Sequence, residues 1–359
     1  MTGARGTRLR TRLSIILWCL GLSLVVASRA WSADTEKELV FAGYGGTLGQ
    51  ALKSTVIAAF EKQYGVKVVF LTAETVNMIA RVKAQAAHPH VDVVAGTDAS
   101  HAIGLREGLF EKLDPKDFPN FAELYPFARY PDGIGVMFGI QALGLEYDSK
   151  VFREKGWAPP SSWNDLWDPK YSGHVVQYNL PSGYAATFLG LLAVLQGGSP
   201  ADLAPAWAKL PGLVPGALAF VDPSAQIDVL FSTGGAWLAY NGSGRIAALA
   251  ATGVPVAMAI PQEGGVLNPN PIDIVKGAPH PMLARAFVNF MLRPDSQAAI
   301  AKGMLLGPVN RTVTLDPDTA AQVPYGPDAV AKLRQIDNTP INDNMAALVH
   351  QWNEMIARK

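Results

Sequence analysis

The sequence predicts an α/β protein built of two lobes, and three observations lead to this fold class. Short runs rich in Val, Ile and Phe alternate with segments of helical period, a pattern typical of parallel strands joined by helical crossovers. The 359 residues exceed what one hydrophobic core ordinarily serves. The alternation is interrupted by a long β-rich passage at 135–147 and then resumes, so we expect two α/β units of roughly 150 residues each.

The first α/β unit begins with the apolar strand 38–42, which leads into apolar residues at four-residue spacing over 48–60, the face of a helix. Gly65 supplies the left-handed residue that commonly ends a helix, and 66–71 is the next strand. A second helix then leads to the strand 91–95. This order of strand, helix, strand, helix, strand predicts a parallel sheet.

The second α/β unit follows a crossing between the lobes, which we place near 141–143. Ser162 is predicted to cap a short helix that runs to Trp167. Further strands are expected at 174–178, 217–221, 236–240 and 254–260, with helices at 185–195, 224–231 and 244–251.

A Gly-rich break at 263–265 marks the return to the first lobe. The segments expected there are a strand at 271–275 and helices at 281–291 and 294–302. We therefore assign 33–141 and 264–310 to lobe 1, and 142–263 and 311–359 to lobe 2.

Residues 1–32 have the pattern of a secretory signal peptide. They contain five arginines and no acid, and four of the arginines precede the apolar run 13–27. Small residues at Ala30 and Ser32 suit a cleavage site, so we expect cleavage near Ser32 and Ala33. An uncleaved anchor is the alternative, and the charged sequence that follows at once disfavours it. Either reading exports the body of the chain.

The charge of the expected mature chain differs from that of the precursor. Loss of the five arginines leaves 25 basic residues against 30 acids, a net charge of −5. An acidic chain without a run of basic residues has no predicted basic patch that could bind the phosphates of nucleic acid. Cys19, the only cysteine, lies within the signal, so we expect no disulfide or thiol chemistry. No later apolar stretch reaches the ~20 residues of a membrane span, and the mature body should be soluble.

Motifs for catalysis or metal binding are not found. The glycine-rich turn at 43–48 follows a strand and opens a helix, but Leu48 takes the place of a glycine that a dinucleotide fingerprint requires. It is either a plain tight turn or a place where a ligand approaches the backbone closely. The six histidines form no HExxH pattern, and no GxSxG is present. We predict that the protein is not an enzyme and has no metal site and no cofactor.

A series of ordered motifs resembles a known family. They are FEKQYGVKV at 60–68, REGLF at 106–110, SWNDLWDPKYSG at 162–173, YNGS at 240–243, PQEGG at 261–265, NFMLRPD at 289–295 and WN at 352–353. Together they span essentially all of 38–358 and are similar to bacterial extracellular solute-binding proteins of the spermidine/putrescine type.

This resemblance implies a type II periplasmic binding protein fold, two α/β lobes joined by crossing strands that close over a ligand. It implies a location in the periplasm, a small-molecule ligand, and an ABC permease and ATPase complex at the inner membrane as partner. We expect a monomer with no nucleic-acid partner. Carried over residue by residue, the family's ligand-stacking aromatics fall on Tyr44 and Tyr240, and its hydroxyl ligand on Thr97.

The sequence departs from the polyamine binders where they hold amines. Ala99 stands in place of an aromatic, Asn268 and Asn270 stand in place of a tryptophan and an aspartate, and 179–183 contains no acid. A buried ammonium without a partner charge is costly. We therefore predict a small zwitterionic, anionic or neutral polar ligand, such as an amino acid, carboxylate or phosphonate.

The candidate ligand-binding residues combine backbone, hydroxyl, amide and charged groups. Arg245 is a candidate clamp for a carboxylate or phosphonate, and Asp98 and Asp222 are the acids best placed for an amine. The remaining candidates are Gly45, Gly46, Thr47, Ser182, Gly183, Tyr184, Asn268 and Asn270.

Three other functions stay open at this point. One is a polyamine binder with a remodelled site. A ferric-ion binder is a second, although the adjacent tyrosines of such family members are missing. The third is a secreted enzyme on the same scaffold, because fold alone does not determine function.

Overall fold

A mixed sheet of ten strands runs through the described part of the protein, residues 36–72, 75–222 and 225–357 of a computed structural model. Its main path is β2-β1-β3-β9-β4-β7-β5-β6, with β10 added beside β9 and β8 beside β4. From Lys37 onward the chain forms one unit. The predicted signal peptide lies outside the described residues.

Lobe 1 contains the parallel strands β1, β2 and β3. Their bounds are Glu38–Gly43, Lys67–Thr72 and Val93–Ala95. The helices around them are α1 (Gly46–Leu52), α2 (Ala58–Tyr64), α3 (Thr75–Ala84), α4 (Asp98–Arg106), α10 (Pro281–Met291) and α11 (Pro294–Met304). A π-helical turn, Lys53–Ile57, joins α1 to α2, and Gly65 ends α2 in the predicted left-handed conformation at φ 66°. The strand order expected for the first third is therefore confirmed.

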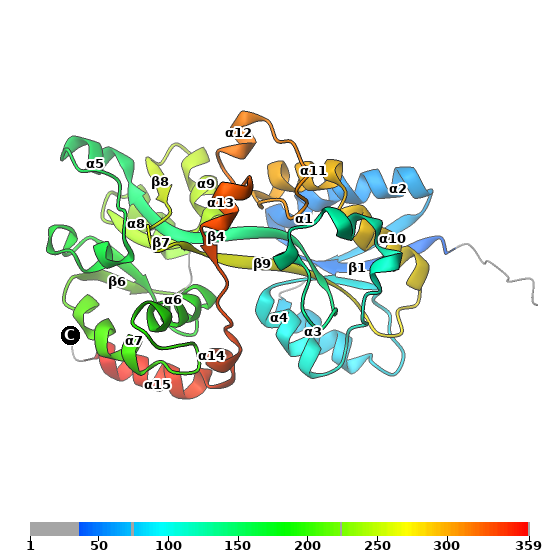
Figure 1. Ribbon diagram of the computed structural model, residues 1–359, viewed down its shortest axis with the longest axis horizontal. Coiled ribbons are helices and arrows are strands. Elements are labelled where there is room, and N and C mark those ends of the chain that lie inside the picture. Colours follow the sequence, from blue (N-terminus) through cyan, green and yellow to red (C-terminus); the bar gives the residue numbers. More distant parts are fainter. Residues whose placement is uncertain (1–35, 73–74, 223–224, 358–359) are drawn as a thin grey trace, which may run out of the picture. The chain divides into compact units, whose positions relative to one another are not determined.

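Two long strands, β4 (Val136–Asp148) and β9 (Gly265–Ile274), cross between the lobes. They are antiparallel over Val136–Leu143 and Val266–Ile272, and they run through the middle of Figure 1. β4 then pairs with β7 and β8 in lobe 2, whereas β9 pairs with β3 in lobe 1. The crossing predicted near 141–143 falls within β4. The strand expected at 271–275 is longer, because it begins at Gly265.

Lobe 2 is assembled on β5 (Val175–Tyr178), β6 (Ala217–Val221), β7 (Leu238–Gly242) and β8 (Val256–Ala259). Its helices are α5 (Ser149–Glu154), α6 (Gly183–Leu195), α7 (Ala204–Lys209), α8 (Ala225–Ser232), α9 (Ser243–Ala251), α14 (Thr339–Asp343) and α15 (Met345–Ile356). Ser162 caps a 3₁₀ turn at Trp163–Trp167 through a capping box with Asp165, as expected.

A third crossing is made by the C-terminal part of the chain. It follows α12 (Pro317–Ala320), α13 (Pro327–Ala331) and β10 (Leu333–Arg334), which pairs with β9. From β10 the chain descends past the middle of Figure 1 to α14 and α15 on lobe 2. We call residues 335–339 the crossing segment.

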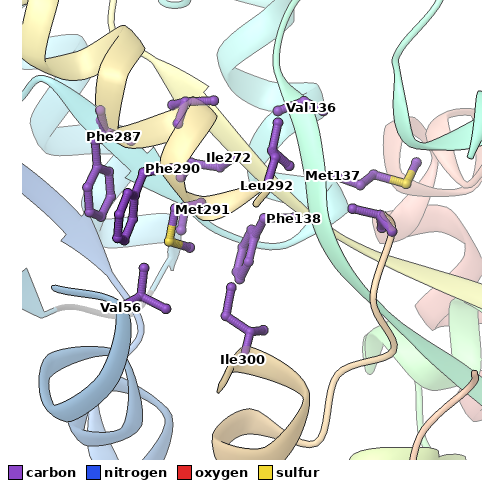
Figure 2. Close-up of a cluster of buried hydrophobic side chains, with 14 of the residues drawn as sticks. Val56, Val136, Met137, Phe138, Ile272, Phe287, Phe290, Met291, Leu292 and Ile300 are labelled. Atoms are coloured by element: carbon purple, nitrogen blue, oxygen red, sulfur yellow. The ribbon is translucent and has the colours of Figure 1, made fainter. Parts of the chain in front are cut away.

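Each lobe has its own hydrophobic core. In lobe 1, Phe41, Phe60 and Phe287 are fully buried with ring centroids about 5 Å apart, and Figure 2 shows Phe287 beside Phe290 and Met291 of α10. The lobe 2 core contains Trp163, Phe188, Tyr240 and Trp352. Val330 packs with the first core and Ile341 with the second. The exact lobe boundaries stay a prediction.

No helix in the described ranges has both the length and the apolar character needed to cross a membrane.

Candidate functional site

A cavity of about 720 Å³ lies where α4, α6, β9 and the crossing segment meet. We call it the interlobe cavity. Lobe 1 contributes α4 and the loop 126–132, lobe 2 contributes Thr187 of α6, and β9 contributes Asn268. Its ionisable lining residues are Asp98, His101, Arg129, Tyr130, Asp132 and Asp337. Both lobes therefore line one polar space, as a ligand trap requires.

Two predicted residues lie on one face of β9. Asn268 pairs with Gln141 of β4, and Asn270 pairs with Gly139. Residues two apart on a strand point to the same side, so both asparagines and Gln141 share a face. Asn268 lines the cavity, and Asn270 is buried with no partner for its Nδ2 among the described residues. This face forms a floor of amide groups between the lobes.

Tyr44 follows β1 and connects lobe 1 to this floor. Its hydroxyl lies 3.0 Å from Asn270 Oδ1 and also contacts the Gly96 carbonyl oxygen. Burial raises the pKa of Tyr44, so the phenol is a neutral hydrogen-bond donor. The aromatic ring predicted to stack on a ligand therefore lies beside the predicted amide.

The start of α4 places Thr97 and Asp98 differently. Thr97 is exposed, and its Oγ1 accepts a hydrogen bond from Ser100 N at 3.3 Å, so it caps the helix. Asp98 is half-buried and lines the cavity. Burial raises the pKa of Asp98 and the carboxylate of Asp337 adds to the rise, while His101 opposes it. The ionised form of Asp98 is thus short of favourable partners.

His101, one helical turn after Asp98, is buried with 4% of its surface exposed. Its Nδ1 lies 2.9 Å from Asp273 Oδ1, and its ring stacks on Tyr130 with centroids 4.1 Å apart. Burial lowers the pKa of His101, but Asp273 together with other nearby carboxylates raises it more. Its Nε2 has no partner among the described residues.

The crossing segment forms a further wall of the cavity. Asn338 Nδ2 donates to Thr187 Oγ1 at 2.8 Å, which attaches the segment to α6, while Asn338 Oδ1 is buried without a partner in the described ranges. Beyond it, Asp343 of α14 pairs with Arg106 of α4 at 2.8 Å. The segment is thus bonded to α6 of lobe 2, and α14, which follows it, is bonded to α4 of lobe 1.

In lobe 2, Tyr184 lies in the first turn of α6 close to Gly242. A Cβ at Gly242 would overlap the Tyr184 hydroxyl and lie 2.8 Å from Gln141 Oε1. Gly242 thus allows Tyr184 and Gln141 to approach the strand end closely. Gln141 also pairs with Asn268 of the amide floor. The end of β7 at Gly242, with Tyr184 beside it, therefore adjoins that floor.

A buried polar network lies under this part of lobe 2. Glu146 of β4 is fully buried and accepts a hydrogen bond from Asn241 Nδ2 at 2.8 Å. Asn241 Oδ1 in turn accepts from the Tyr178 hydroxyl and from Gly242 N, each at 2.9 Å. Burial raises the pKa of Glu146 to about 7, and Asp228 adds to the rise, while the Asn241 bond and Arg245 oppose it. Glu146 Oε1 has no partner among the described residues.

Arg245 and Tyr240 are engaged within lobe 2 in this structure. Arg245 Nη2 pairs with Asp228 Oδ2 at 2.8 Å, and both side chains are about 30% exposed. Tyr240 is fully buried and stacks on Phe188, with centroids 4.3 Å apart. Its ring is therefore a packing element, and its role as a ligand-stacking residue stays a prediction.

The other predicted residues lie at helix starts and strand ends. Gly45 and Gly46 are exposed at the start of α1, where Gly46 has φ 61°, and the side chain of Thr47 lies outside the described part of the structure. Ser182 and Gly183 open α6, and Asp222 is exposed after β6. The residues brought together at the interlobe cavity and its floor are thus Tyr44, Asp98, Asn268 and Asn270.

A second cavity, of about 500 Å³, lies between α9, β8 and the segment 321–333. Its lining is dominated by Ala, Val, Ile and Met, and Lys332 is its only charged residue. It lacks the converging polar groups of a site for a polar solute. Within the described ranges, no group of three or more His, Cys, Asp or Glu side chains is placed to hold a metal ion.

Several site residues were missed from the sequence. His101 could have been predicted, because it lies three positions after Asp98 on the same helix face. Asp337 and Asn338 carried no signal, because they are about 240 residues from Asp98 along the chain. The same holds for the acids Glu146 and Asp228, since the acids predicted for an amine were Asp98 and Asp222.

Two α/β lobes joined by crossing strands, with a polar cavity between them, define the class of extracytoplasmic solute-binding proteins. Residues 55–325 match the family described as bacterial extracellular solute-binding protein. The chain belongs to this family, whose members are solute-binding proteins, and the predicted resemblance is confirmed.

Curated relatives span nearly the whole chain. A gamma-aminobutyric acid-binding protein of Pseudomonas aeruginosa is 28% identical over 355 residues, covering 94% of this chain and 95% of that protein. The spermidine/putrescine-binding periplasmic protein of Escherichia coli is 26% identical over 321 residues, covering 86% and 88%. A periplasmic location fits these relatives.

Solved structures show the fold. An ABC transporter protein from Clostridium perfringens has a TM-score of 0.79 at 24% identity, covering 89% of this chain and 99% of that one. A spermidine/putrescine substrate-binding protein from Streptococcus pneumoniae has a TM-score of 0.74 at 18% identity, covering 89% and 100%. The predicted periplasmic binding protein fold is confirmed.

Proposed function

We propose that this chain is the periplasmic substrate-binding component of an ABC importer, and that it captures a small polar organic solute between its lobes by hinge closure. The observation that carries the proposal is the interlobe cavity, which is lined by residues from both lobes and from two crossings. Closure around a ligand that contacts both lobes is stabilised by the contacts made only in the closed form. The permease would recognise that form.

The polarity of the site supports a ligand with charged or strongly polar ends. The cavity is lined by carboxylates, one arginine and amides, and its floor carries Asn268 beside Gln141. Its volume of about 720 Å³ lies in the range that holds a small organic molecule. These features support the predicted small polar solute, and the relative named for gamma-aminobutyric acid supports the zwitterionic member of that group.

Two of the alternatives are less well supported. A ferric-ion binder would need a cluster of metal ligands, and no group of three or more His, Cys, Asp or Glu side chains is placed for one in the described ranges. A secreted enzyme would need a nucleophile beside a base. No serine, cysteine or lysine lines the interlobe cavity, and the Thr187 hydroxyl that lines it is bonded to the Asn338 amide.

The test is a ligand screen on the exported protein, purified after expression of the full-length gene. Thermal shift followed by calorimetry should cover amino acids, organic acids, phosphonates and polyamines, together with mass spectrometry of whatever co-purifies. We expect one polar solute to bind with micromolar or tighter affinity and to raise the unfolding temperature. Turnover of a solute, or stabilisation by none of them, contradicts the proposal.

A further inference from the structure

The interlobe cavity has a surplus of negative charge on one side. Three carboxylates line it, those of Asp98, Asp132 and Asp337, whereas Arg129 is the one arginine. His101 also lines it, but its Nδ1 is bonded to the buried carboxylate of Asp273 at 2.9 Å. Arg129 can balance one of the three lining carboxylates, and His101 is paired with Asp273, so at least two carboxylates have no cation to balance them, whether His101 is neutral or protonated.

Asp98 and Asp337 are the acids that act on one another. The charge of Asp337 contributes to the raised pKa of Asp98, so the two carboxylates repel each other across the cavity. Asp337 is exposed on the crossing segment, and Asp98 is half-buried at the start of α4. A cation placed between them would relieve this repulsion.

Acceptors without partners lie at the same place. His101 is 4% exposed and lines the cavity, and its Nε2 has no partner among the described residues. When the ring is neutral and its Nδ1 donates to Asp273, Nε2 is an acceptor. Asn338 Oδ1 is a second buried acceptor with no partner in the described ranges, beside Asp337 in the crossing segment. An ammonium group has three N–H donors, which suits such a set.

We propose that Asp98 and Asp337, with His101 and Asn338 beside them, form the subsite for the single primary ammonium group of the solute. The inference rests on the proposed function and specifies the ligand class. Because Asp337 belongs to the crossing segment and Asp98 to α4, an ammonium between them would also hold the segment against lobe 1.

The same charges favour one ammonium over two. Two acids of lobe 2, Asp228 and Glu146, are already engaged, since Asp228 pairs with Arg245 at 2.8 Å and fully buried Glu146 accepts from Asn241. A second ammonium beside these two acids would find no free carboxylate, and a desolvated cation without one is strongly disfavoured. The lobe 2 end instead offers Tyr184 and the amide of Gln141 near the start of α6, which suit a carboxylate or another polar acceptor.

The experiment compares matched ligands by calorimetry at pH 7 on the full exported protein. The probes are 4-aminobutyrate, butyrate, which lacks the ammonium group, and putrescine, which has an ammonium at both ends, with 3-aminopropionate and 5-aminopentanoate to cover length. We expect an amino acid of this series to bind, and its analogue without the ammonium to bind at least about tenfold more weakly. Putrescine should also bind more weakly.

Two variants test the residues, with a matched control. Asp98→Asn and Asp337→Asn should each weaken binding of the amino acid about ten- to hundredfold, as expected for loss of a charged hydrogen-bond partner. Because the ionised form of Asp98 is disfavoured in the free protein, Asp98→Asn should still fold and should not lower the unfolding temperature. Asp318→Asn removes a carboxylate from the first turn of α12, outside the cavity, and should bind as the wild type does.

The outcomes separate the two proposals. Equal binding of butyrate, or wild-type affinity in both aspartate variants, overturns the ammonium subsite. Binding of a carboxylate, phosphonate or diamine from the wider screen, with none of the amino acids bound, overturns the subsite and leaves the solute-binding function standing. If no solute in either set binds, both proposals fail.

Discussion

The buried carboxyl of Glu146 makes stability depend on pH in a direction opposite to that of an ordinary acid. Its pKa rises from 4.5 to about 7 on folding, mainly because burial penalises the charged form. Between these values the native state holds a proton that the unfolded state has released. The stabilisation is therefore fully present below about pH 4.5 and is lost as the pH rises through 7.

The magnitude follows from the size of the pKa change. Each pKa unit corresponds to about 1.4 kcal/mol, so a rise from 4.5 to about 7 gives roughly 3 kcal/mol between the two limits. The Glu146 side chain is fully buried, so solvent screening reduces this little. Glu146→Gln keeps the shape and the acceptor for Asn241 but cannot ionise. Relative to the wild type, this variant should gain about 3 kcal/mol of stability as the pH is raised from 4.5 to 7.5.

The assay is urea unfolding followed by tryptophan fluorescence, at several values of pH between 4.5 and 7.5. The quantity to compare is the difference in unfolding free energy between variant and wild type, because His101 and other groups also titrate in this range and cancel in the difference. Glu38→Gln, at the exposed start of β1, controls for the loss of one carboxylate. A difference that stays constant across this pH range would refute the reasoning.

Three further substitutions test the packing and the site. Gly135→Ala should lower the free energy of unfolding in urea by about 2 kcal/mol, because Gly135 has φ 69° and a Cβ there would overlap Asp273 Oδ1. Unchanged stability would contradict the close approach of Asp273 to the Gly135 backbone. Phe287→Ala should cost about 3–5 kcal/mol in the same assay, since its ring is fully buried in the lobe 1 core shown in Figure 2, and a loss below 1 kcal/mol would argue against that packing. Tyr44→Phe should cost about 1 kcal/mol of stability and weaken solute binding severalfold in calorimetry, because the hydroxyl contacting Asn270 is lost; wild-type affinity would place the ligand away from Tyr44.

Local signals predicted much of the fold. Gly65 ends a helix through its backbone conformation, and Ser162 caps one through hydrogen bonds to its neighbours. Both roles could therefore be predicted from a few adjacent residues. The parallel order of β1, β2 and β3 follows from alternating strand and helix patterns. Such features depend on short segments, and the sequence contains all that determines them.

Features set by distant pairing were not predicted in detail. β9 begins at Gly265 because Gly265 pairs with Leu333 of β10 and Val266 pairs with Leu143 of β4, both far away along the chain, and no local pattern marks that start. Trp237 is half-buried and stacks on His174, which lies far from it along the chain, with centroids 3.4 Å apart. β7 was expected to end at Tyr240 but continues to Gly242, which keeps the Tyr240 ring inside the sheet's packing instead of at its edge.

The candidate site was predicted where residues follow strands directly and missed where the chain returns late. Tyr44, Asp98 and Asn268 come from such strand ends and from β9, and they lie at or beside the cavity. Asp337 arrives through the third crossing, which nothing in its own sequence neighbourhood indicates. Comparison of single positions with the polyamine binders therefore identified only some of the acids that a ligand could contact.

The distribution of charge between the two ends of the site, more than the number of acids, bears on which ligand can bind. Lobe 2 contains Glu146 and Asp228, but the first is buried and favours its neutral form, while the second is neutralised by Arg245. Among the described residues, no arginine or lysine is paired with Asp98 or Asp337 as Arg245 is with Asp228. A diamine needs free carboxylates at both ends, whereas a zwitterion needs them at one. The free acids therefore favour the amine end at α4 and the crossing segment, and the carboxylate end toward α6.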